Sequence, residues 1–203
     1  MAALTLLATI CAGGCEPALR TAGPASAAAT LPPDLDQLAA APAPPVAVPS
    51  GTTFFPNVSC GPTDENVFDI FLPASDEPTA LVIFIHGGGF TRGDKSMAYV
   101  EDNASVIHEL LSAGVAYAAF NYRLLREIDD GGVETPLLDN ARCLQSLRAR
   151  AETFNLDRGR VAVYGQSAGA ATSLWLGTHD DLAEPESPSP EARESTRVRA
   201  VGL

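Results

Sequence analysis

Short apolar runs alternate with stretches of helical apolar spacing from about position 66 to the end of the chain. Strands are predicted over Val67–Leu72, Ala80–Ile85, Val115–Phe120, Arg160–Tyr164 and Val198–Leu203. Between them, helices are predicted within residues 100–111, 135–147 and 168–176. The second of these strands is apolar on both faces, as a central parallel strand is. Strands that alternate with helices predict the α/β class, a doubly wound and mostly parallel sheet with helices on both faces.

The first 15 residues have a different pattern and are typical of an export signal. Ala2–Ala12 is apolar but too short to span a bilayer as a helix. The small residues that follow end in Cys15, and this arrangement resembles the lipobox of bacterial lipoproteins. Cys15 is therefore the lipidation candidate, and a lipid anchor in the bacterial cell envelope is one expectation. A signal peptide cut near Ala25–Ala27, which would give a secreted protein, is the alternative, as is a misassigned start.

Residues 16–56 are rich in Ala and Pro and are predicted to form a spacer without a core of its own. The folded domain is then expected over residues 57–203. With 203 residues, 46% of them hydrophobic, the chain has material for one substantial core. No internal repeat is present.

The charge balance narrows the classes of partner. Lys and Arg number 13 and Asp and Glu number 25, which gives a net charge of -12. Nucleic acids and anionic membranes bind basic faces, so neither is expected as a partner. Cys60 and Cys143 lie outside the leader, and they either form a disulfide in an oxidising compartment or remain thiols, with Cys143 buried in a helix. No Cys/His cluster with zinc spacing exists, so no metal site is predicted.

Gly165-Gln166-Ser167-Ala168-Gly169 lies between a predicted strand and a predicted helix. This GxSxG form is typical of a nucleophile elbow, a sharp turn that exposes a serine hydroxyl at the edge of the sheet. Ser167 is therefore the candidate catalytic nucleophile, with a purely structural turn as the alternative. The turn needs small flanking residues, and Gly165 and Gly169 supply them. The backbone N–H of Ala168, at the start of the helix, is predicted to point at a reacting carbonyl oxygen.

His86-Gly87-Gly88-Gly89-Phe90 directly follows the predicted central strand. Glycines let backbone N–H groups approach a substrate oxygen because no Cβ intervenes. Gly88 and Gly89 are therefore predicted to form an oxyanion hole, with His86 and Gly87 as structural support. A glycine turn without a catalytic role is the alternative.

These two strings and Asn121-Tyr122-Arg123-Leu124 together resemble the carboxylesterase and lipase branch of the α/β-hydrolase superfamily, in particular its small bacterial esterases. The resemblance covers about Asn66 to Leu203. It implies cleavage of carboxylic esters through an acyl-enzyme on Ser167, with small-molecule or polysaccharide-linked ester substrates, sometimes of the feruloyl or acetyl-xylan type. It implies an oxyanion hole of Gly88, Gly89 and Ala168, and a bracing role for residues 121–124. It implies no cofactor.

In that family an acid and a histidine follow the serine. The chain has three histidines, His86, His108 and His179. His179 lies 12 residues past Ser167, which is roughly 18 Å along a helix at about 1.5 Å per residue. We therefore expect a fragment of a longer esterase, with a sheet incomplete at its C-terminal end and little activity as written. The alternatives are a non-catalytic α/β-hydrolase-like module that binds a ligand or partner in the same cleft, and peptidase or thioesterase chemistry.

Three charged features have competing interpretations. Asp139, near the start of its helix, is predicted to complement the helix dipole. Asp94–Lys95, which follows the glycine loop, either lines an acyl pocket or is a solvated charge pair. The polar residues 180–194 form either a lid over the site or a solvated loop.

Overall fold

The computed structural model describes residues 43–125 and 131–203, without the side chains of residues 101 and 102. The predictions about the leader, Cys15 included, and about the spacer up to residue 42 fall outside the described residues. The elements are β1 (Thr53–Ser59), β2 (Val67–Leu72), β3 (Thr79–Ile85), the 3-10 helix η1 (Lys95–Tyr99), α2 (Glu101–Ser112), β4 (Ala116–Phe120), α3 (Glu134–Ala149), β5 (Leu156–Gly165), α4 (Ala168–Thr178) and β6 (Ala200–Gly202).

The six strands form one sheet in the order β1-β2-β4-β3-β5-β6. The pairs β1-β2 and β2-β4 are antiparallel, and the pairs of β3 with β4, β3 with β5 and β5 with β6 are parallel. The predicted mostly parallel sheet is confirmed. All seven residues of β3 are buried, which explains its continuous apolar run. Because β3 and β5 are parallel neighbours, their carboxyl ends bring the two glycine-containing strings to the same edge of the sheet.

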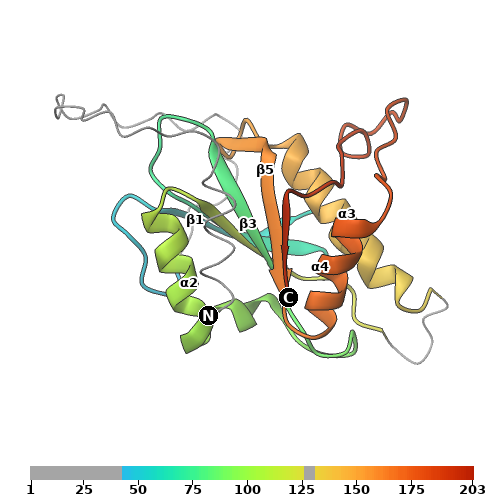
Figure 1. Cartoon of the computed structure of the whole chain (residues 1–203), viewed down its shortest axis with the longest axis horizontal. Coiled ribbons are helices and arrows are strands. Elements are labelled where there is room, and N and C mark those ends of the chain that lie inside the picture. Colours follow the sequence, from blue (N-terminus) through green and yellow to red (C-terminus); the bar gives the residue numbers. More distant parts are fainter. Residues whose placement is uncertain (1–42, 126–130) are drawn as a thin grey trace.

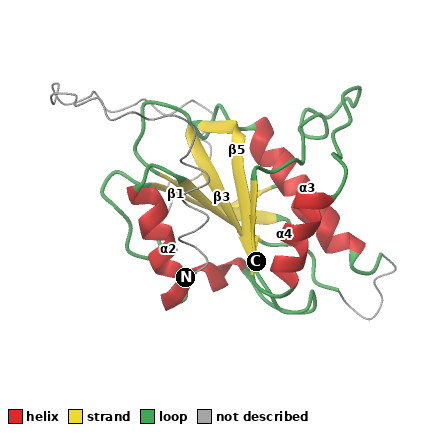
Figure 2. Cartoon of the chain, viewed as in Figure 1, coloured by secondary structure: helices red, strands yellow, loops and turns green. Residues whose placement is uncertain are grey.

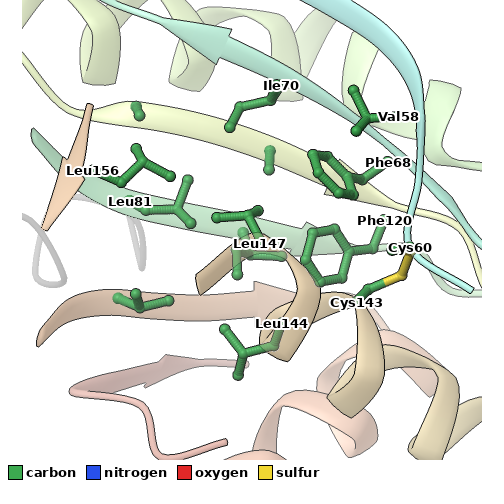
Figure 3. Packing of buried hydrophobic residues seen from close by; sticks show 14 of the residues in the cluster. Val58, Cys60, Phe68, Ile70, Leu81, Phe120, Cys143, Leu144, Leu147 and Leu156 are labelled. Carbon is green, nitrogen blue, oxygen red and sulfur yellow. A yellow bond between two sulfur atoms is a disulfide. The ribbon is translucent and has the colours of Figure 1, made fainter. Parts of the chain in front are cut away.

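Helices cover both faces of the sheet, as Figures 1 and 2 show. α2 packs on one face, where Ile107, Leu110 and Leu111 join a buried cluster with residues of β3 and β4. α3 and α4 pack on the other face, where Leu144 and Leu147 of α3 belong to a second buried cluster with Phe68 of β2 and Phe120 of β4 (Figure 3). The doubly wound arrangement is therefore confirmed as well.

The sequence did not predict the first strand. β1 begins at Thr53, inside the segment assigned to the spacer, so the folded part of the chain starts before residue 57. Phe54 and Phe55 are buried on opposite faces of the sheet. Pro56 interrupts their alternation and the pairing register with β2 shifts there, next to Asn57 with its positive φ of 53°. Proline and an irregular register conceal an edge strand from pattern analysis.

A disulfide joins Cys60, which follows β1, to Cys143 on α3. Their Cα atoms are 4.8 Å apart, and both residues are buried in the core (Figure 3). Of the two alternatives for these cysteines, the structure has the bonded pair and not the buried thiol. Arg150 Nη2 adds a second connection by donating to the Ser59 carbonyl at 2.7 Å. The edge strand is thus fastened to a helix of the neighbouring layer.

The polar residues 180–194 do not cover the carboxyl edge of the sheet. They follow the end of α4 that is distant from Ser167, and Figure 1 shows them in red beside the opposite edge. Gln145 Nε2 on α3 donates to the carbonyl oxygens of Ala192 and Glu194 at 3.3 and 2.9 Å. The segment is therefore a loop packed against α3, and not a lid. No helix within the described ranges is both long and apolar enough to cross a membrane.

Candidate active site

Ser167 connects β5 to α4 through a sharp turn. Its backbone has φ 53° and ψ -114°, a conformation that a non-glycine residue adopts only when the surrounding structure enforces it. Ser167 is exposed to solvent. The turn therefore has the backbone strain and the exposure that the sequence predicted for an elbow.

The two glycines of the elbow are required by the end of β3. A Cβ on Gly169 would lie 1.9 Å from the carbonyl oxygen of Ile85, and a Cβ on Gly165 would lie 2.4 Å from the same oxygen. Backbone atoms cannot move aside as a side chain can. Gly165 and Gly169 thus support the elbow by letting α4 start directly against β3.

The glycine loop after β3 contacts the elbow. A Cβ on Gly87 would lie 2.7 Å from the Gln166 carbonyl oxygen and 3.5 Å from Ser167 Cβ. Gly88 has φ 112°, and a Cβ there would lie 1.9 Å from the Arg92 carbonyl oxygen. The loop can reach the serine only because these positions lack side chains.

Three backbone N–H groups beside the serine have no acceptor. Within the described ranges, the amides of Gly88, Gly89 and Ala168 donate to no other group. Gly89 is exposed, with φ 64° and open space where a Cβ would stand. Ala168 is the first residue of α4, where N–H groups lack partners within the helix. The elbow and the glycine loop, which contact each other at Gly87, therefore carry three unpaired backbone donors.

His86 supports the loop from below. Its ring is buried and stacks on Tyr122, with centroids 4.2 Å apart and planes 11° from parallel. Its Nδ1 lies 2.7 Å from the Gly87 carbonyl oxygen, and the Tyr122 hydroxyl donates to the His86 carbonyl at 2.9 Å. Burial lowers the pKa of His86, although the Gly87 carbonyl and the Asp94 carboxylate oppose that shift. The imidazole is thus neutral at pH 7. Its ring is held in place by the stacking on Tyr122 and by the Gly87 carbonyl.

Asp94 and Lys95 brace the far end of the loop, which neither interpretation of the sequence foresaw. Asn121 Nδ2 donates to Asp94 Oδ2 at 2.8 Å, and the Lys95 amide donates to Asn121 Oδ1 at 2.6 Å. Lys95 Nζ forms a buried ion pair with Asp69 Oδ1 on β2, at 3.1 Å. Burial would raise the pKa of Asp94, but hydrogen bonds from Asn121 and Ser96 outweigh it and hold that pKa below its ordinary value.

The predicted role of Asp139 is wrong. Its carboxylate does not serve the helix dipole but binds Arg123, which donates from Nε at 2.9 Å, from Nη2 at 2.7 Å and from its backbone amide at 3.0 Å. Burial would raise the pKa of Asp139, but these hydrogen bonds dominate and the pKa is lowered. The pair fixes residues 121–124 to α3, as the family resemblance implied for that segment.

We expect Asp139→Asn to lower the free energy of unfolding by about 2 kcal/mol, because it replaces a buried charged acceptor by a neutral amide. The difference from wild type is present above the ordinary carboxyl pKa of 3.8 and shrinks as pH falls below it, because the folded-state pKa is depressed. Urea unfolding at pH 7 and pH 3 measures both effects.

Asp157→Asn is the matched control, since Asp157 pairs with Arg160 on the surface at 2.7 Å. Its loss should be at most about 0.5 kcal/mol. Equal losses in the two variants would contradict a special role for the buried pair.

The sequence missed Asp69. Its carboxylate is buried within an otherwise apolar strand and accepts hydrogen bonds from the Tyr99 hydroxyl and the Asn57 amide, in addition to the Lys95 ion pair. An acid inside an apolar run was the available signal, because a buried charge requires partners. The partners themselves could not be read from the pattern.

No histidine is brought to Ser167. The hydroxyl of Ser167 forms no hydrogen bond with any residue that the structure describes. His108 lies on α2 and His179 follows α4, where its ring packs on Trp175. The described residues thus join the predicted nucleophile to the predicted oxyanion donors but supply no base. They also contain no cluster of three or more metal-ligating side chains.

Comparison with known proteins assigns the chain to a family. The model of the BD-FAE family matches residues 68–201, which include both glycine-containing strings. The chain belongs to the BD-FAE family. As a member of this family it has the α/β-hydrolase fold of carboxylesterases, and the proteins it resembles are esterase-type hydrolases.

Individual relatives agree with this assignment. Juvenile hormone esterase of Tribolium castaneum is 28% identical over 59% of the chain, which spans 21% of that enzyme. The structure resembles an acetyl ester-xyloside bifunctional hydrolase from Caldicellulosiruptor lactoaceticus, with a TM-score of 0.54 and 27% identity, over 66% of this chain and 47% of that one. It shares its fold with a truncated carbohydrate esterase from gut microbiota, with a TM-score of 0.60 and 23% identity, over 73% of this chain and 55% of that one.

Proposed function

We propose that this BD-FAE chain carries the nucleophile and the oxyanion hole of a serine carboxylic ester hydrolase, with Ser167 as the nucleophile. The observation that carries the proposal is the contact between the strained, exposed Ser167 and the glycine loop, whose Gly88 and Gly89 amides have no acceptor among the described residues. Ala168 contributes the third donor. Family membership supports the ester class.

In the first half of the reaction, Ser167 Oγ attacks the ester carbonyl carbon, and the hydroxyl proton passes to a base. The carbonyl oxygen becomes an oxyanion that accepts hydrogen bonds from Gly88, Gly89 and Ala168; each such donor is typically worth about 10²–10³ in rate. Collapse of this intermediate breaks the bond to the alkoxy oxygen, which takes up a proton and leaves as an alcohol. Water then repeats the attack on the acyl-enzyme, releases the carboxylic acid and restores the serine.

The base must come from outside the described residues, because His86 is occupied by packing and neither His108 nor His179 is near Ser167. Without a base, a serine hydrolase loses on the order of 10⁶ in kcat and keeps about 10³–10⁴ over water from the oxyanion hole and binding. The same observation favours a second candidate function, a non-catalytic module that binds an ester-like or other ligand beside Ser167.

Acylation of Ser167 in the presence of an external base separates the two candidates. The 203-residue chain is incubated with p-nitrophenyl acetate at increasing imidazole concentrations, and the acetylated peptide is identified by mass spectrometry. We expect acetyl groups on the peptide that contains Ser167, formed faster as imidazole accepts the hydroxyl proton. Once imidazole is removed by desalting, the acyl-enzyme should persist, because deacylation needs a base as well.

Ser167→Ala should abolish this labelling, whereas Ser112→Ala, which removes an exposed serine from α2, should leave it unchanged. Acetylation that is indifferent to Ser167→Ala, or independent of imidazole, would overturn the proposal and favour the binding module. Thermal unfolding of both variants shows that the fold is intact.

For the whole protein we propose a small-molecule or carbohydrate-linked ester as the substrate. Support comes from the names of two structures with the same fold, an acetyl ester-xyloside hydrolase and a carbohydrate esterase. We also propose export, supported by the apolar leader and by the disulfide between Cys60 and Cys143, which persists in oxidising compartments. Lipidation at Cys15 remains the specific proposal for the anchor.

A further inference from the structure

A cavity of about 330 Å³ opens at the edge of the sheet opposite Ser167. It lies between the last turn of α3, the start of β5 and the segment that leads into β6, near the red loop in Figure 1. We call it the arginine cavity after its lining, which consists of Arg148, Arg158, Gly159, Glu194, Ser195, Arg197, Val198 and Arg199. Its volume is at the lower end of the range for small-ligand sites.

The charge of the arginine cavity is opposite to that of the protein. The chain as a whole carries a net charge of -12 with 13 basic residues. Four arginines line this one cavity against a single carboxylate, Glu194, which leaves a formal charge of +3. Glu152 and Asp180, which lie outside the lining, pair with Arg158 and Arg197 at 3.7 and 3.8 Å and offset part of this charge. The remaining like charges in one concavity focus a positive potential, which attracts anions.

Arg148 is buried at the bottom of the arginine cavity. Its side chain is held by backbone carbonyls alone: Nε donates to Arg158 at 3.2 Å, and the two Nη atoms donate to Ser195 and Arg197. Among the residues that the structure describes, no carboxylate forms an ion pair with it. Burial lowers the pKa of Arg148, and the charges of Asp181 and Glu194 nearby oppose that shift. The guanidinium is thus fixed in orientation, but its charge is not neutralised by a direct ion pair.

The other guanidinium groups differ in how far they are neutralised. Arg158 Nη1 is paired with Glu194 Oε1 at 2.8 Å. Arg197 Nη1 donates to the His179 carbonyl at 2.9 Å, and Arg197 Nη2 lies 3.8 Å from Asp180 Oδ1 in an exposed ion pair. Arg199 donates from Nε to the Gly159 carbonyl at 3.0 Å, and its two Nη atoms donate to no described residue. Arg199 therefore presents a guanidinium fork, the geometry that binds carboxylate, sulfate and phosphate oxygens with two hydrogen bonds.

The arginine cavity is remote from the proposed chemistry. Arg158 precedes Ser167 by nine residues, most of them in the extended strand β5. From Val161 to Gly165 the strand pairs in regular register with β3, and at about 3.3 Å per residue this stretch alone separates the cavity from Ser167 by roughly 13 Å. A molecule bound here would leave the carboxyl edge of the sheet free. The site is therefore separate from the proposed function and does not depend on it.

We propose that the arginine cavity binds an oxyanion group, a carboxylate, sulfate or phosphate carried by a small ligand or a sugar. Arg199 forms the fork that receives the group, Arg148 supplies fixed positive charge beneath it, and Arg158 and Arg197 flank it. Glu194 holds Arg158 in place and would repel an anion on its own side of the cavity, so the anion is expected on the side of Arg199.

Titration of the 203-residue chain tests the proposal. Sodium sulfate, sodium phosphate and sodium galacturonate are added separately, with ionic strength held constant by sodium chloride, and binding is followed by calorimetry and by arginine Nε–H NMR signals. We expect saturable binding of at least one anion, weakened about tenfold by Arg199→Gln, since a hydrogen bond to a charged group is worth about 1.5–3 kcal/mol.

Arg193→Gln is the matched control. Arg193 is an exposed arginine of the same loop whose Nη1 donates to the Ser187 carbonyl, and it does not line the cavity. It should not change the affinity. An equal loss in both variants would reduce the effect to general charge attraction and overturn the proposal, and so would binding that never saturates or that Arg199→Gln leaves intact.

The three anions also identify the source of the oxyanion. Binding of galacturonate but not of sulfate or phosphate would assign the cavity to a carboxylate-bearing sugar. The reverse result would assign it to a sulfate or phosphate group. Both results support the site, because in each the affinity depends on Arg199.

Discussion

Gly169→Ala should unfold the chain or lower its free energy of unfolding by more than about 4 kcal/mol, although it adds one methyl group and favours helix. The new Cβ would lie 1.9 Å from the Ile85 carbonyl oxygen and 2.8 Å from that of His86. Both are backbone atoms at the end of the central strand, so neither can rotate away. This overlap can be relieved only if α4 moves away from β3, and that movement would also displace the elbow. Circular dichroism and urea unfolding measure the loss.

Gly177→Ala is the matched control, because it makes the same change in the same helix. There the added Cβ would meet Val201 Cγ2 at 2.5 Å, a side-chain methyl that a rotation can move. The gain in helix propensity, about 1 kcal/mol, opposes the cost of that rotation, so we expect a small net change. If Gly169→Ala were as well tolerated as Gly177→Ala, the close approach of α4 to β3 would not be needed for the fold.

The parts of the fold that the sequence predicted are those whose signal is local. β2 has the bounds that were expected, Val67–Leu72, and β3 differs from its prediction by one residue. Both strands are apolar runs that end at a proline or at the glycine loop. A strand inside a sheet that is covered on both faces requires mainly apolar residues, so its sequence signal is local. β5 starts at Leu156, four residues before the predicted start, because its first half is polar and leaves the core.

The two strings of the candidate site were visible for the same reason. Where a Cβ would overlap a backbone oxygen, no residue other than glycine fits. The glycines in the sequence therefore indicate directly where two backbone segments approach closely. The charged pairs behind the site are different. Lys95 binds Asp69, and Arg123 binds Asp139, across 26 and 16 residues of sequence. Partners of this kind are set by how β2 and α3 pack, which one-dimensional spacing does not encode.

Removal of the disulfide should have the other large effect. Cys60 and Cys143 close a loop of 83 residues, and the entropy of such a loop in the unfolded chain corresponds to about 4.5 kcal/mol. We expect the double variant Cys60→Ala/Cys143→Ala to lose roughly 4 kcal/mol and to melt roughly 10 °C lower. Alanine is chosen because both sites are buried and a serine hydroxyl would lack partners there. Guanidinium unfolding measures the difference.

The single variant Cys143→Ala serves as the control, since it also lacks the bond and should be about as unstable as the double variant. Wild type unfolded under reducing conditions should approach the same value, because its reduced denatured state is no longer constrained. A wild type equally stable with and without reductant would contradict the prediction. Since the bond ties the edge strand β1 to α3, which also holds the Arg123–Asp139 pair behind the candidate site, an oxidising compartment would stabilise both the fold and the site.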